Sequence, residues 1–317
     1  MRMLLDNVDT NSASGPNSFG RAFSNELKRR GVEVDNLLEC IRSRRPIMKP
    51  DVHMAFIETQ LNLGDTPLIQ RLDGIYYNSD DRYGCWWEQN KTIKQTYDRA
   101  FGVVFQSEFS RRLVEAFYNE HPMSTIIGNG VDMSEFIDLQ PLDMPQLDSC
   151  SGNVWVAASN WRPHKRLVEN VRYFKEHARH DDVLVIAGGT TYDPPADDRI
   201  IYTGELDRQT LISLYKRAKY FVHLAFHDNC PNVVVDARAA GCSIICAGAS
   251  GSPSIAGPDA IVIDEDEWTP APIQLYNPPC LDFKRARRNG IESNIDIINV
   301  VDRYIDFITS IVEVSVS

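Results

Sequence analysis

Short apolar runs alternate along the first part of the chain with segments whose apolar residues recur at helical spacing. The apolar runs of strand length lie at 1–7, 32–34, 51–56, 67–72 and 101–107. A polar loop at 11–20 and a helical segment at 21–30, ended by Gly31, separate the first two runs. Strand, loop, helix and strand in this order form the repeating unit of parallel sheets. The pattern therefore predicts an α/β fold.

The same alternation resumes after an interruption at 138–153, where periodicity is lost and Pro, Asp, Gln and Ser accumulate. This composition is typical of an interdomain linker. The strand-like runs beyond it lie at 154–158, 183–189, 200–204, 221–225 and 243–247, with helical segments at 167–177, 206–218 and 295–312. We therefore expect two Rossmann-like parallel-sheet domains, residues 1–145 and 146–317.

Length and composition fit this organisation. At 317 residues the chain is long enough for two domains of ordinary size. No apolar run is long enough to cross a bilayer, and the start MRMLLDNVDTNSASG turns polar too early for a signal peptide, so we expect a cytoplasmic protein. Seven cysteines without paired spacing suit a reducing compartment. Cys242 and Cys246 lack the further ligands that zinc needs, so no metal site is expected.

The charge pattern limits the partners. A net charge of −11 argues against nucleic acid as the general partner, because phosphate binding needs a surplus of cations on one face. The basic residues near the amino end are Lys28, Arg29, Arg30, Arg42, Arg44, Arg45 and Lys49. They allow two interpretations, either weak contact with anionic lipid or a phosphorylated acceptor, or ordinary solvated helix faces and loop ends.

The stretch HDNCPNVVVDARAAGCSIIC, residues 227–246, holds the most informative chemistry. It reads as a polar loop with Asp228, a helix with Asp236 about one turn in, and a helix end at Gly241. The free N–H groups at a helix start bind anions, so a diphosphate fits there while the two acids accept hydrogen bonds from hydroxyls. The alternative is that Asp228 and Asn229 only cap the helix and Asp236 is solvated.

In this stretch CPNVVVDARAAG resembles the donor-site signature of family 4 glycosyltransferases, which are retaining enzymes of the GT-B fold. The signature has two acids eight residues apart, typically glutamates, before an Ala-x-Ala-x-Gly helix end; here both acids are aspartates. The segment IIGNGVDMSEF, 126–136, resembles the family's Asn-Gly-Val-Asp segment. The resemblance implies two domains that face each other across a cleft, with the last helix, about 295–312, packing back on the amino-terminal domain.

A second group of polar residues, SNWRPHKR at 159–166, precedes a helical segment. Cations beside a helix start stabilise the charge on a leaving pyrophosphate, although a solvated basic turn has the same appearance. The group resembles the family's Gly-Arg-x-x-Pro-x-Lys segment, with Lys165 in the lysine position. Asn160 stands where the family has arginine, and we expect Arg162 to take over its phosphate contact.

The strand at 67–72 runs into Asp73, and ligands of open α/β sheets bind at this kind of edge. Arg71 and Asp73 are therefore acceptor-side candidates, and the alternative is that they pair with each other.

The resemblance assigns roles to further residues. It implies catalytic roles for Asp228, Arg162 and Lys165, and ribose binding by Asp236. The other donor-side candidates are the loop and helix-start residues Asn229, Cys230, Pro231, Asn232 and Val233, the nucleobase-side residues Glu205 and Leu206, the glycines Gly188 and Gly189, and the residues Gly15, Pro16, Asn17 and Ser18, which lie where the family has a glycine-rich loop.

The function that follows is retaining transfer of a sugar, a hexose, from a UDP- or GDP-sugar to a glycan, lipid-linked or small-molecule acceptor. Fixed cations and a helix dipole do what a divalent ion does elsewhere, so no metal or other cofactor is expected. Two alternatives remain. One is a GT-B sugar-nucleotide epimerase, and the other is a sugar-nucleotide-binding protein without turnover, which the shortened acids and the missing arginine suggest.

Overall fold

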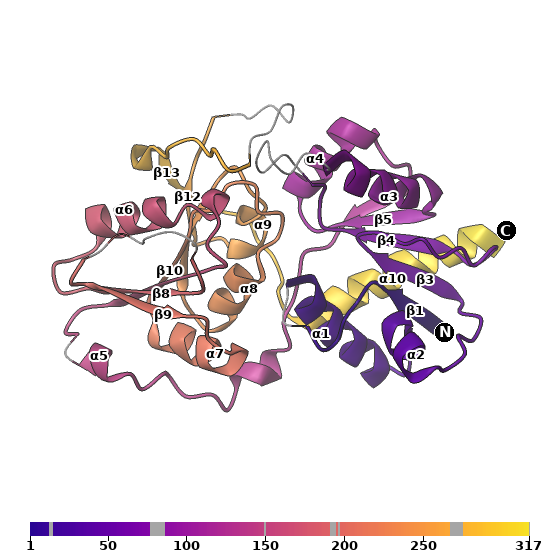
Figure 1. The fold of residues 1–317 in the computed structure, drawn as a ribbon, viewed down its shortest axis with the longest axis horizontal. Coiled ribbons are helices and arrows are strands. Elements are labelled where there is room, and N and C mark those ends of the chain that lie inside the picture. Colours follow the sequence, from indigo (N-terminus) through magenta and orange to yellow (C-terminus); the bar gives the residue numbers. More distant parts are fainter. Residues whose placement is uncertain are drawn as a thin grey trace. The chain divides into compact units, whose positions relative to one another are not determined.

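The computed structural model describes residues 1–12, 15–76, 86–148, 150–190, 195, 197–266 and 275–316. The chain forms two compact units. Unit 1 consists of Met1–Asp132 and Asn294–Ser317, and unit 2 consists of Met133–Ser293. Each unit is a parallel α/β layer structure (Figure 1). The predicted fold class is therefore confirmed.

Unit 1 contains a six-stranded sheet of order β2-β1-β3-β4-β5-β6, in which every neighbouring pair is parallel. Its strands are β1 (Arg2–Asp6), β2 (Glu33–Asn36), β3 (Val52–Phe56), β4 (Leu68–Leu72), β5 (Gly102–Phe105) and β6 (Ser124–Ile126). Its helices are α1 (Gly15–Arg29), α2 (Leu37–Ser43), α3 (Trp86–Arg99), α4 (Glu108–Tyr118) and α10 (Ile297–Val316).

Helix α1 begins earlier than the sequence pattern predicts. The loop expected at 11–20 already becomes helical at Gly15, because the apolar stripe of Phe23 and Leu27 continues one turn upstream to Phe19, and all three side chains are buried. The ring of Phe19 stacks on that of Phe23 at 5.7 Å between centroids. Gly20 also suits this helix, because a Cβ there would lie 2.6 Å from Val8 Cγ1.

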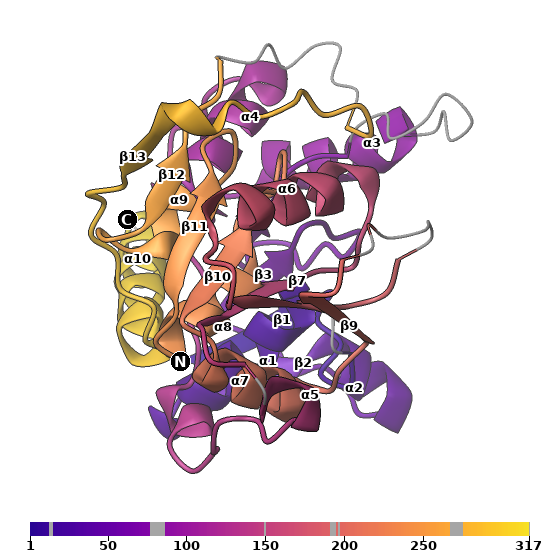
Figure 2. The same cartoon turned by 90° about the vertical axis from the view of Figure 1, so that its left-hand side faces the viewer.

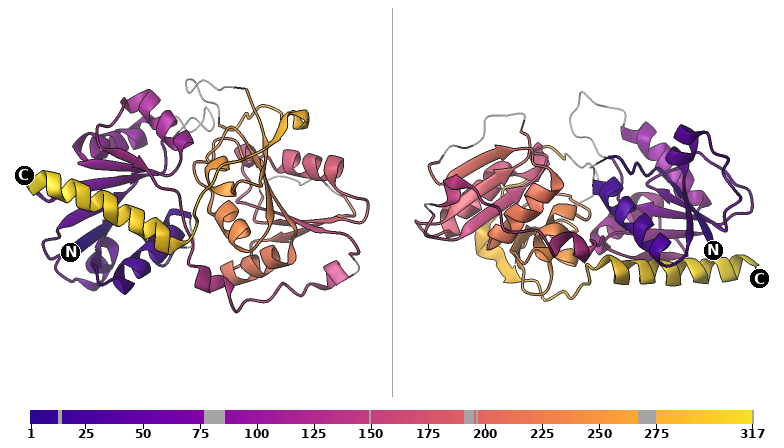
Figure 3. Two further views of the ribbon diagram at one scale, coloured as in Figure 1. Left: turned by 180° about the vertical axis from the view of Figure 1, so that it is seen from behind. Right: turned by 90° about the horizontal axis from the view of Figure 1, so that it is seen from below.

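The final helix α10 belongs to unit 1 although unit 2 precedes it in the chain (Figure 3). Tyr304 lies edge-on to the ring of Phe23, 4.8 Å away between centroids, and is fully buried. Arg30, just after α1, also donates to the carbonyl of Ile298 at 2.8 Å. The last helix thus packs back on the amino-terminal unit, as the GT-B resemblance implies. Within the described ranges, none of the helices combines the length and apolar character needed to span a bilayer.

Unit 2 contains a seven-stranded sheet of order β13-β12-β11-β10-β7-β8-β9. Its neighbouring strands are parallel except for β12 and β13, which pair antiparallel at one edge. Its strands are β7 (Val154–Ala158), β8 (Val183–Ala187), β9 (Ile200–Gly204), β10 (Tyr220–His223), β11 (Ser243–Ala247), β12 (Ile261–Ile263) and β13 (Ala286–Arg288). Its helices are η2 (Met133–Phe136), α5 (Pro145–Asp148), η3 (Pro163–Lys165), α6 (Leu167–His177), α7 (Arg208–Arg217), α8 (Asn232–Ala239), α9 (Pro253–Ala256) and η4 (Phe283–Arg285). Helices α6 and α7 lie on opposite faces of the sheet (Figures 1 and 2).

The two units meet along the chain at Asp132 and Met133, whereas the sequence places the boundary at residue 145. Residues 133–148 belong to unit 2 because tertiary hydrogen bonds attach them to α7. The N–H of Leu142 donates to the carbonyl of Ser213 at 2.9 Å. Lys216 Nζ donates to the carbonyl of Leu139 at 2.6 Å. The aperiodic, polar stretch at 138–153 thus belongs to unit 2 and is not an interdomain linker.

Candidate functional site

The site lies where β7 and β10 of unit 2 end. The two strands pair in parallel, so their carboxyl ends, and the loops that follow them, share one edge of the sheet. The loop after β7 contains Arg162 and Lys165, and the loop after β10 contains Asp228. Residues more than sixty positions apart in sequence thereby come together, as the sequence motifs predict.

Asp228 is held by two donors on one oxygen. Lys165 Nζ lies 2.5 Å from Asp228 Oδ2, and His223 Nε2 lies 3.0 Å from the same oxygen. Among the described residues, Asp228 Oδ1 has no recorded hydrogen-bond partner. The Asp228 and Lys165 side chains are 16% and 19% exposed. One carboxylate oxygen is therefore fixed while the other is available to accept a hydrogen bond from a ligand hydroxyl.

The protonation states follow from this geometry. Burial by itself would raise the pKa of Asp228, but the charge of Lys165 and the hydrogen bond from His223 outweigh burial and hold this pKa well below its usual value. Burial lowers the pKa of His223, although Asp228 acts in the opposite direction. The histidine is then neutral at pH 7, with its Nε2 as the donor. The site therefore presents an ionised carboxylate and an ammonium group side by side.

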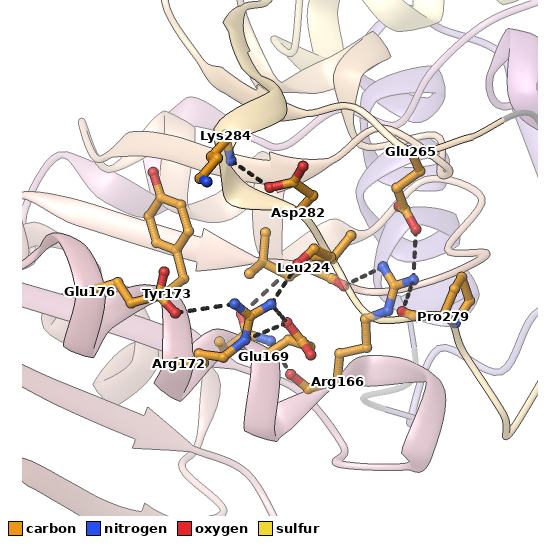
Figure 4. A network of polar contacts seen from close by, with 12 residues as sticks. Arg166, Glu169, Arg172, Tyr173, Glu176, Leu224, Glu265, Pro279, Asp282 and Lys284 are labelled. Carbon is orange, nitrogen blue, oxygen red and sulfur yellow. Dashed lines mark hydrogen bonds and ion pairs between the residues drawn. The ribbon is translucent and has the colours of Figure 1, made fainter.

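A buried arginine fixes the backbone next to Lys165 (Figure 4). Arg166 adopts a left-handed conformation with φ 52° and is 3% exposed. Its guanidinium donates to Glu265 at 2.6 Å and to the carbonyls of Pro279 and Leu224 at 2.8 and 3.3 Å. These contacts connect the end of η3 to the loops after β10 and β12. Because the Arg166 contacts immobilise its backbone, the adjacent Lys165 is held in place at the edge of the sheet.

The neighbouring arginine in Figure 4, Arg172 of α6, fastens the segment around η4 to the same helix. It donates to Glu169 and Glu176 on its own helix and to the carbonyl of Leu281 at 2.6 Å. Its guanidinium lies 3.8 Å from the centroid of the Phe283 ring. These contacts are structural, because they hold the segment around η4 against α6.

The loop with Asp228 is also anchored through its backbone. The N–H of Gly251 donates to the carbonyl of Asp228 at 2.6 Å, and the N–H of His227 donates to the carbonyl of Ala249 at 3.1 Å. Helix α8 then begins at Asn232 with Pro231 as its N-cap and no side-chain cap. The alternative in which Asp228 caps the helix is therefore wrong, because its carboxylate contacts Lys165 and His223 instead.

The other predicted donor-side residues of these two loops differ in exposure. Asn229, Asn232 and Val233 are partly exposed, whereas Cys230 and Pro231 are buried. Arg162 precedes η3, is exposed, and has no side-chain partner among the described residues. Its expected contact with a diphosphate stays a prediction.

Asp236 of α8 is not open in this structure. Arg208 of α7 binds both of its oxygens at 2.8 and 3.1 Å, and also reaches Glu135 Oε2 at 2.8 Å. Burial would lower the pKa of Arg208, but the two carboxylates outweigh burial and hold this pKa above its usual value. The alternative in which Asp236 is solvated is therefore wrong, since its side chain is 7% exposed. Ribose binding by Asp236 stays a prediction.

Sequence reasoning missed His223 and Arg208. His223 is the last residue of an apolar strand, and this polar residue at the ligand-binding edge was the available signal. Arg208 gave no signal, because its partner lies 28 positions away in sequence.

The two glycines follow β8, and the predicted nucleobase-side residues Glu205 and Leu206 follow the neighbouring strand β9. Gly188 has φ +106°, and a Cβ there would lie 1.8 Å from the carbonyl oxygen of Ser159. A Cβ on Gly189 would meet only Glu205 Oε1, at 3.3 Å. Glu205 is exposed and Leu206 half-buried. The structure thus brings Gly189 and Glu205 together. Gly188 instead lies against the backbone of Ser159, where a side chain would not fit.

In unit 1 the acceptor-side candidates pair with each other. Arg71 Nη1 lies 2.5 Å from Asp73 Oδ1, and Nη2 lies 2.6 Å from Asn129 Oδ1. The Arg71 guanidinium also lies 4.4 and 4.8 Å from the centroids of Phe19 and Phe56 and is completely buried. Arg71 and Asp73 therefore pair with each other, as the alternative interpretation of the sequence predicts. Their contact with an acceptor stays a prediction.

The residues expected in a glycine-rich loop begin α1 instead. Gly15 is the first residue of α1, and the side chains at positions 15 and 16, like all of residues 13–14, lie outside the described residues. Asn17 Oδ1 accepts a hydrogen bond from the N–H of Asp9 at 2.8 Å, and Ser18 is half-buried. A donor-phosphate role for Gly15, Pro16, Asn17 and Ser18 stays a prediction.

Comparisons with known proteins agree with this architecture. Residues 150–277 match the family model of glycosyl transferases group 1. Sucrose-phosphate synthase from Thermosynechococcus elongatus superposes with a TM-score of 0.70 at 12% identity, covering 98% of each chain. The Anabaena protein Alr3699/HepE in complex with UDP-glucose gives 0.64 at 13% identity, covering 98% of this chain and 100% of that one. WaaG, a glycosyltransferase involved in lipopolysaccharide biosynthesis, gives 0.59 at 10% identity, covering 99% and 94%.

A search of curated proteins found no match. The family match covers the unit that holds Lys165, Asp228 and Asp236, and the structural matches extend over both units. The predicted resemblance is thus confirmed: the chain has the two-domain GT-B fold, and residues 150–277 match the model of the group 1 glycosyl transferases.

Proposed function

We propose that this protein transfers a hexose from a nucleoside diphosphate sugar to a glycan, lipid-linked or small-molecule acceptor, with retention of anomeric configuration. The observation that carries the proposal is the state of Asp228. Lys165 and His223 hold its Oδ2, while Oδ1 has no partner among the described residues. A carboxylate in this state accepts a hydrogen bond from a sugar hydroxyl beside the ammonium group that binds the leaving diphosphate.

The diphosphate contacts are supplied by cations and by a helix start. Lys165 already lies in the site, and Arg162, exposed three residues before it, adds a second cation. The first N–H groups of α8 lack a side-chain cap and suit an anion. These groups stabilise the charge that grows as the bond between sugar and phosphate breaks, so we propose that transfer needs no divalent metal or other cofactor.

Two lines favour a uridine nucleotide over a guanosine nucleotide. Alr3699/HepE has a similar fold and was solved with UDP-glucose, and an α,α-trehalose-phosphate synthase of similar fold is described as UDP-forming. We therefore propose UDP-hexose as the first donor to test and GDP-hexose as the second. Retention is proposed from the family 4 motif around Asp228 and Asp236.

The decisive experiment incubates the full chain with a panel of UDP- and GDP-sugars and measures nucleotide release with and without glycan acceptors, in the presence and absence of EDTA. Asp228→Ala should lower release at least 100-fold, because it removes the hydroxyl acceptor and leaves Lys165 without its partner. The matched control is Asp259→Ala, since Asp259 pairs with Arg288 on the exposed surface of the same unit. Release by Asp228→Ala equal to that of the control would reject the proposal.

A second candidate, binding of sugar nucleotides without turnover, is favoured by one observation. Arg208 occupies both oxygens of Asp236, the residue expected to bind ribose. Calorimetry on the same panel separates the two candidates. Tight binding without release of nucleotide under any acceptor condition would establish the second candidate in place of the first.

We also propose a cytoplasmic location. Among the described residues, Cys40, Cys150, Cys242, Cys246 and Cys280 are free thiols. Free thiols suit a reducing compartment. Fractionation of cells that express the tagged chain tests this location, and recovery in an oxidising compartment would contradict it.

A further inference from the structure

Residues 41–49, with the sequence IRSRRPIMK, form the basic-apolar segment of unit 1. It starts in the last turn of α2 and continues to the residue before Pro50, ahead of β3. All nine residues are exposed. The segment contains four cations and no acid, in a chain whose net charge is −11. Its composition is therefore opposite in charge to that of the protein as a whole.

Most of this positive charge is not neutralised. Arg42 pairs with Asp9 through two hydrogen bonds of 2.8 and 2.9 Å. Arg44, Arg45 and Lys49 have no acidic partner among the described residues. The acids on either side of the segment are engaged elsewhere, because Glu39 accepts from Thr10 Oγ1 and Asp51 accepts from the N–H of Arg2. Three cations are thus available to an anionic partner.

The same segment exposes large apolar side chains. Ile41 is 61% exposed, Met48 is 54% exposed and Ile47 is 36% exposed. Cations next to exposed aliphatic side chains suit the interface of a bilayer, where the headgroups attract the cations and the acyl boundary accepts the aliphatic groups. Single-stranded nucleic acid would reward aromatic side chains, and the segment has none. The chemistry therefore favours a lipid surface over nucleic acid.

The fold presents the segment at a margin of unit 1. Helix α2 follows β2, which is an edge strand of the six-stranded sheet, and the helix lies beside β1 and β2 (Figure 1). Cys40 of α2 is buried, whereas the residues after it are all exposed. The segment begins beside the loop after β1, because Arg42 pairs with Asp9, and its other end leads into the amino end of β3.

We propose that the basic-apolar segment binds reversibly to the surface of a membrane that contains anionic lipids. Each basic residue near such a surface contributes about a fivefold gain in affinity, so the three available cations contribute roughly 100-fold together. The attraction is screened by salt, and binding therefore weakens as ionic strength rises. This inference does not depend on the proposed transferase activity.

The test is co-sedimentation of the full chain with two kinds of vesicle, phosphatidylcholine alone and phosphatidylcholine mixed with phosphatidylglycerol. We expect binding to the mixed vesicles only, with release at high salt. The triple variant Arg44→Gln, Arg45→Gln, Lys49→Gln should reduce binding roughly 100-fold. The matched control Lys91→Gln, Arg217→Gln, Lys284→Gln has the same net charge, removes exposed cations elsewhere, and should bind as the original chain does.

A second variant, Ile41→Ser with Met48→Ser, keeps every charge and should also weaken binding, which separates lipid insertion from attraction by charge alone. Thermal unfolding and nucleotide binding of each variant show whether the fold and the donor site are retained. The proposal is overturned by equal binding to both vesicle types, by an equal loss in the control triple, or by single-stranded RNA that competes fully with the vesicles. Failure here leaves the donor site of unit 2 untouched, because nucleotide binding is measured separately.

Discussion

Each unit has an aspartate paired with a cation near the carboxyl end of a parallel strand, and the two pairs differ in how much of their charge is satisfied. In unit 1, Arg71 is completely buried and contacts Asp73, Asn129 and two aromatic rings. In unit 2, Lys165 and Asp228 are partly exposed and Asp228 Oδ1 has no partner among the described residues.

The difference separates structural charge from ligand-binding charge. A completely buried arginine with several partners stabilises the fold but is not accessible to a ligand. A lysine with a single carboxylate partner at a partly exposed edge keeps N–H groups for a phosphate. Burial raises the pKa of Asp73 although Arg71 opposes it, whereas the pKa of Asp228 is lowered. The Arg71–Asp73 pair therefore stabilises the fold, whereas the Lys165–Asp228 pair suits ligand binding.

The largest expected effect is on unit 1. Arg71→Met leaves Asp73 without its cation and should lower the free energy of unfolding by about 3–5 kcal/mol. Urea denaturation measures this change, and calorimetry should find donor binding to unit 2 unchanged. The comparison fails if Arg71→Met is as stable as the original chain, and Arg303→Met, with an exposed side chain in the same unit, is the control.

Lys165→Met should act in the opposite way. Loss of the ammonium group next to the leaving diphosphate should reduce kcat by about 100- to 1000-fold, with a change in stability below about 1 kcal/mol. Steady-state kinetics with the donor identified by the panel measures the loss. Lys175→Met removes an exposed, paired lysine of the same unit and should retain activity. Retained activity in Lys165→Met would show that its pair with Asp228 is structural, like that of Arg71.

The two glycines after β8 offer a finer separation of fold from ligand. Gly188→Ala should lower the free energy of unfolding by about 2–3 kcal/mol, because φ +106° is unfavourable for alanine and the Cβ meets the carbonyl of Ser159. Gly189→Ala meets only the end of a flexible glutamate and should cost less than about 1 kcal/mol. Donor affinity of Gly189→Ala then shows whether a ligand approaches that backbone. Equal stability of both variants would contradict the distinction.

The smallest expected effect, counted per pH unit, is the pH dependence of stability. Burial lowers the pKa of His164 to about 3, so from pH 6.5 down to about 3 the unfolded chain binds a proton that the folded chain does not. Stability is therefore fully present above pH 6.5 and falls on acidification, by about 1 kcal/mol per pH unit from this residue.

His164→Phe should reduce that slope in urea titrations between pH 7 and pH 4. At neutral pH the variant should be about as stable as the original chain, because the buried His164 Nδ1 has no hydrogen-bond partner in the described part of the chain and the ring stacks on Tyr276. An unchanged slope would show that His164 titrates normally. The control His180→Phe changes a histidine for which no packed partner is recorded among the described residues.

Local sequence patterns predicted much of this molecule. The apolar runs located most of the strands along the chain, and the motifs around Lys165 and Asp228 indicated that both residues lie at one edge, because parallel strands share the direction of their carboxyl ends. The start of α1 was misplaced because Phe19 lies among polar and glycine residues typical of a loop, and only its packing on Phe23 makes that turn helical.

The amino-acid sequence by itself determined two α/β units, the resemblance of the second unit to a glycosyltransferase family, and the charged residues of its candidate site. Tertiary structure decided which of those charges are satisfied. Arg208 on Asp236, Lys165 on Asp228 and Asn129 on Arg71 are pairs between different elements, and each depends on how the elements pack. Hydrophobic periodicity records which face of an element is buried, whereas partner choice depends on distances of a few ångströms that only the folded chain sets.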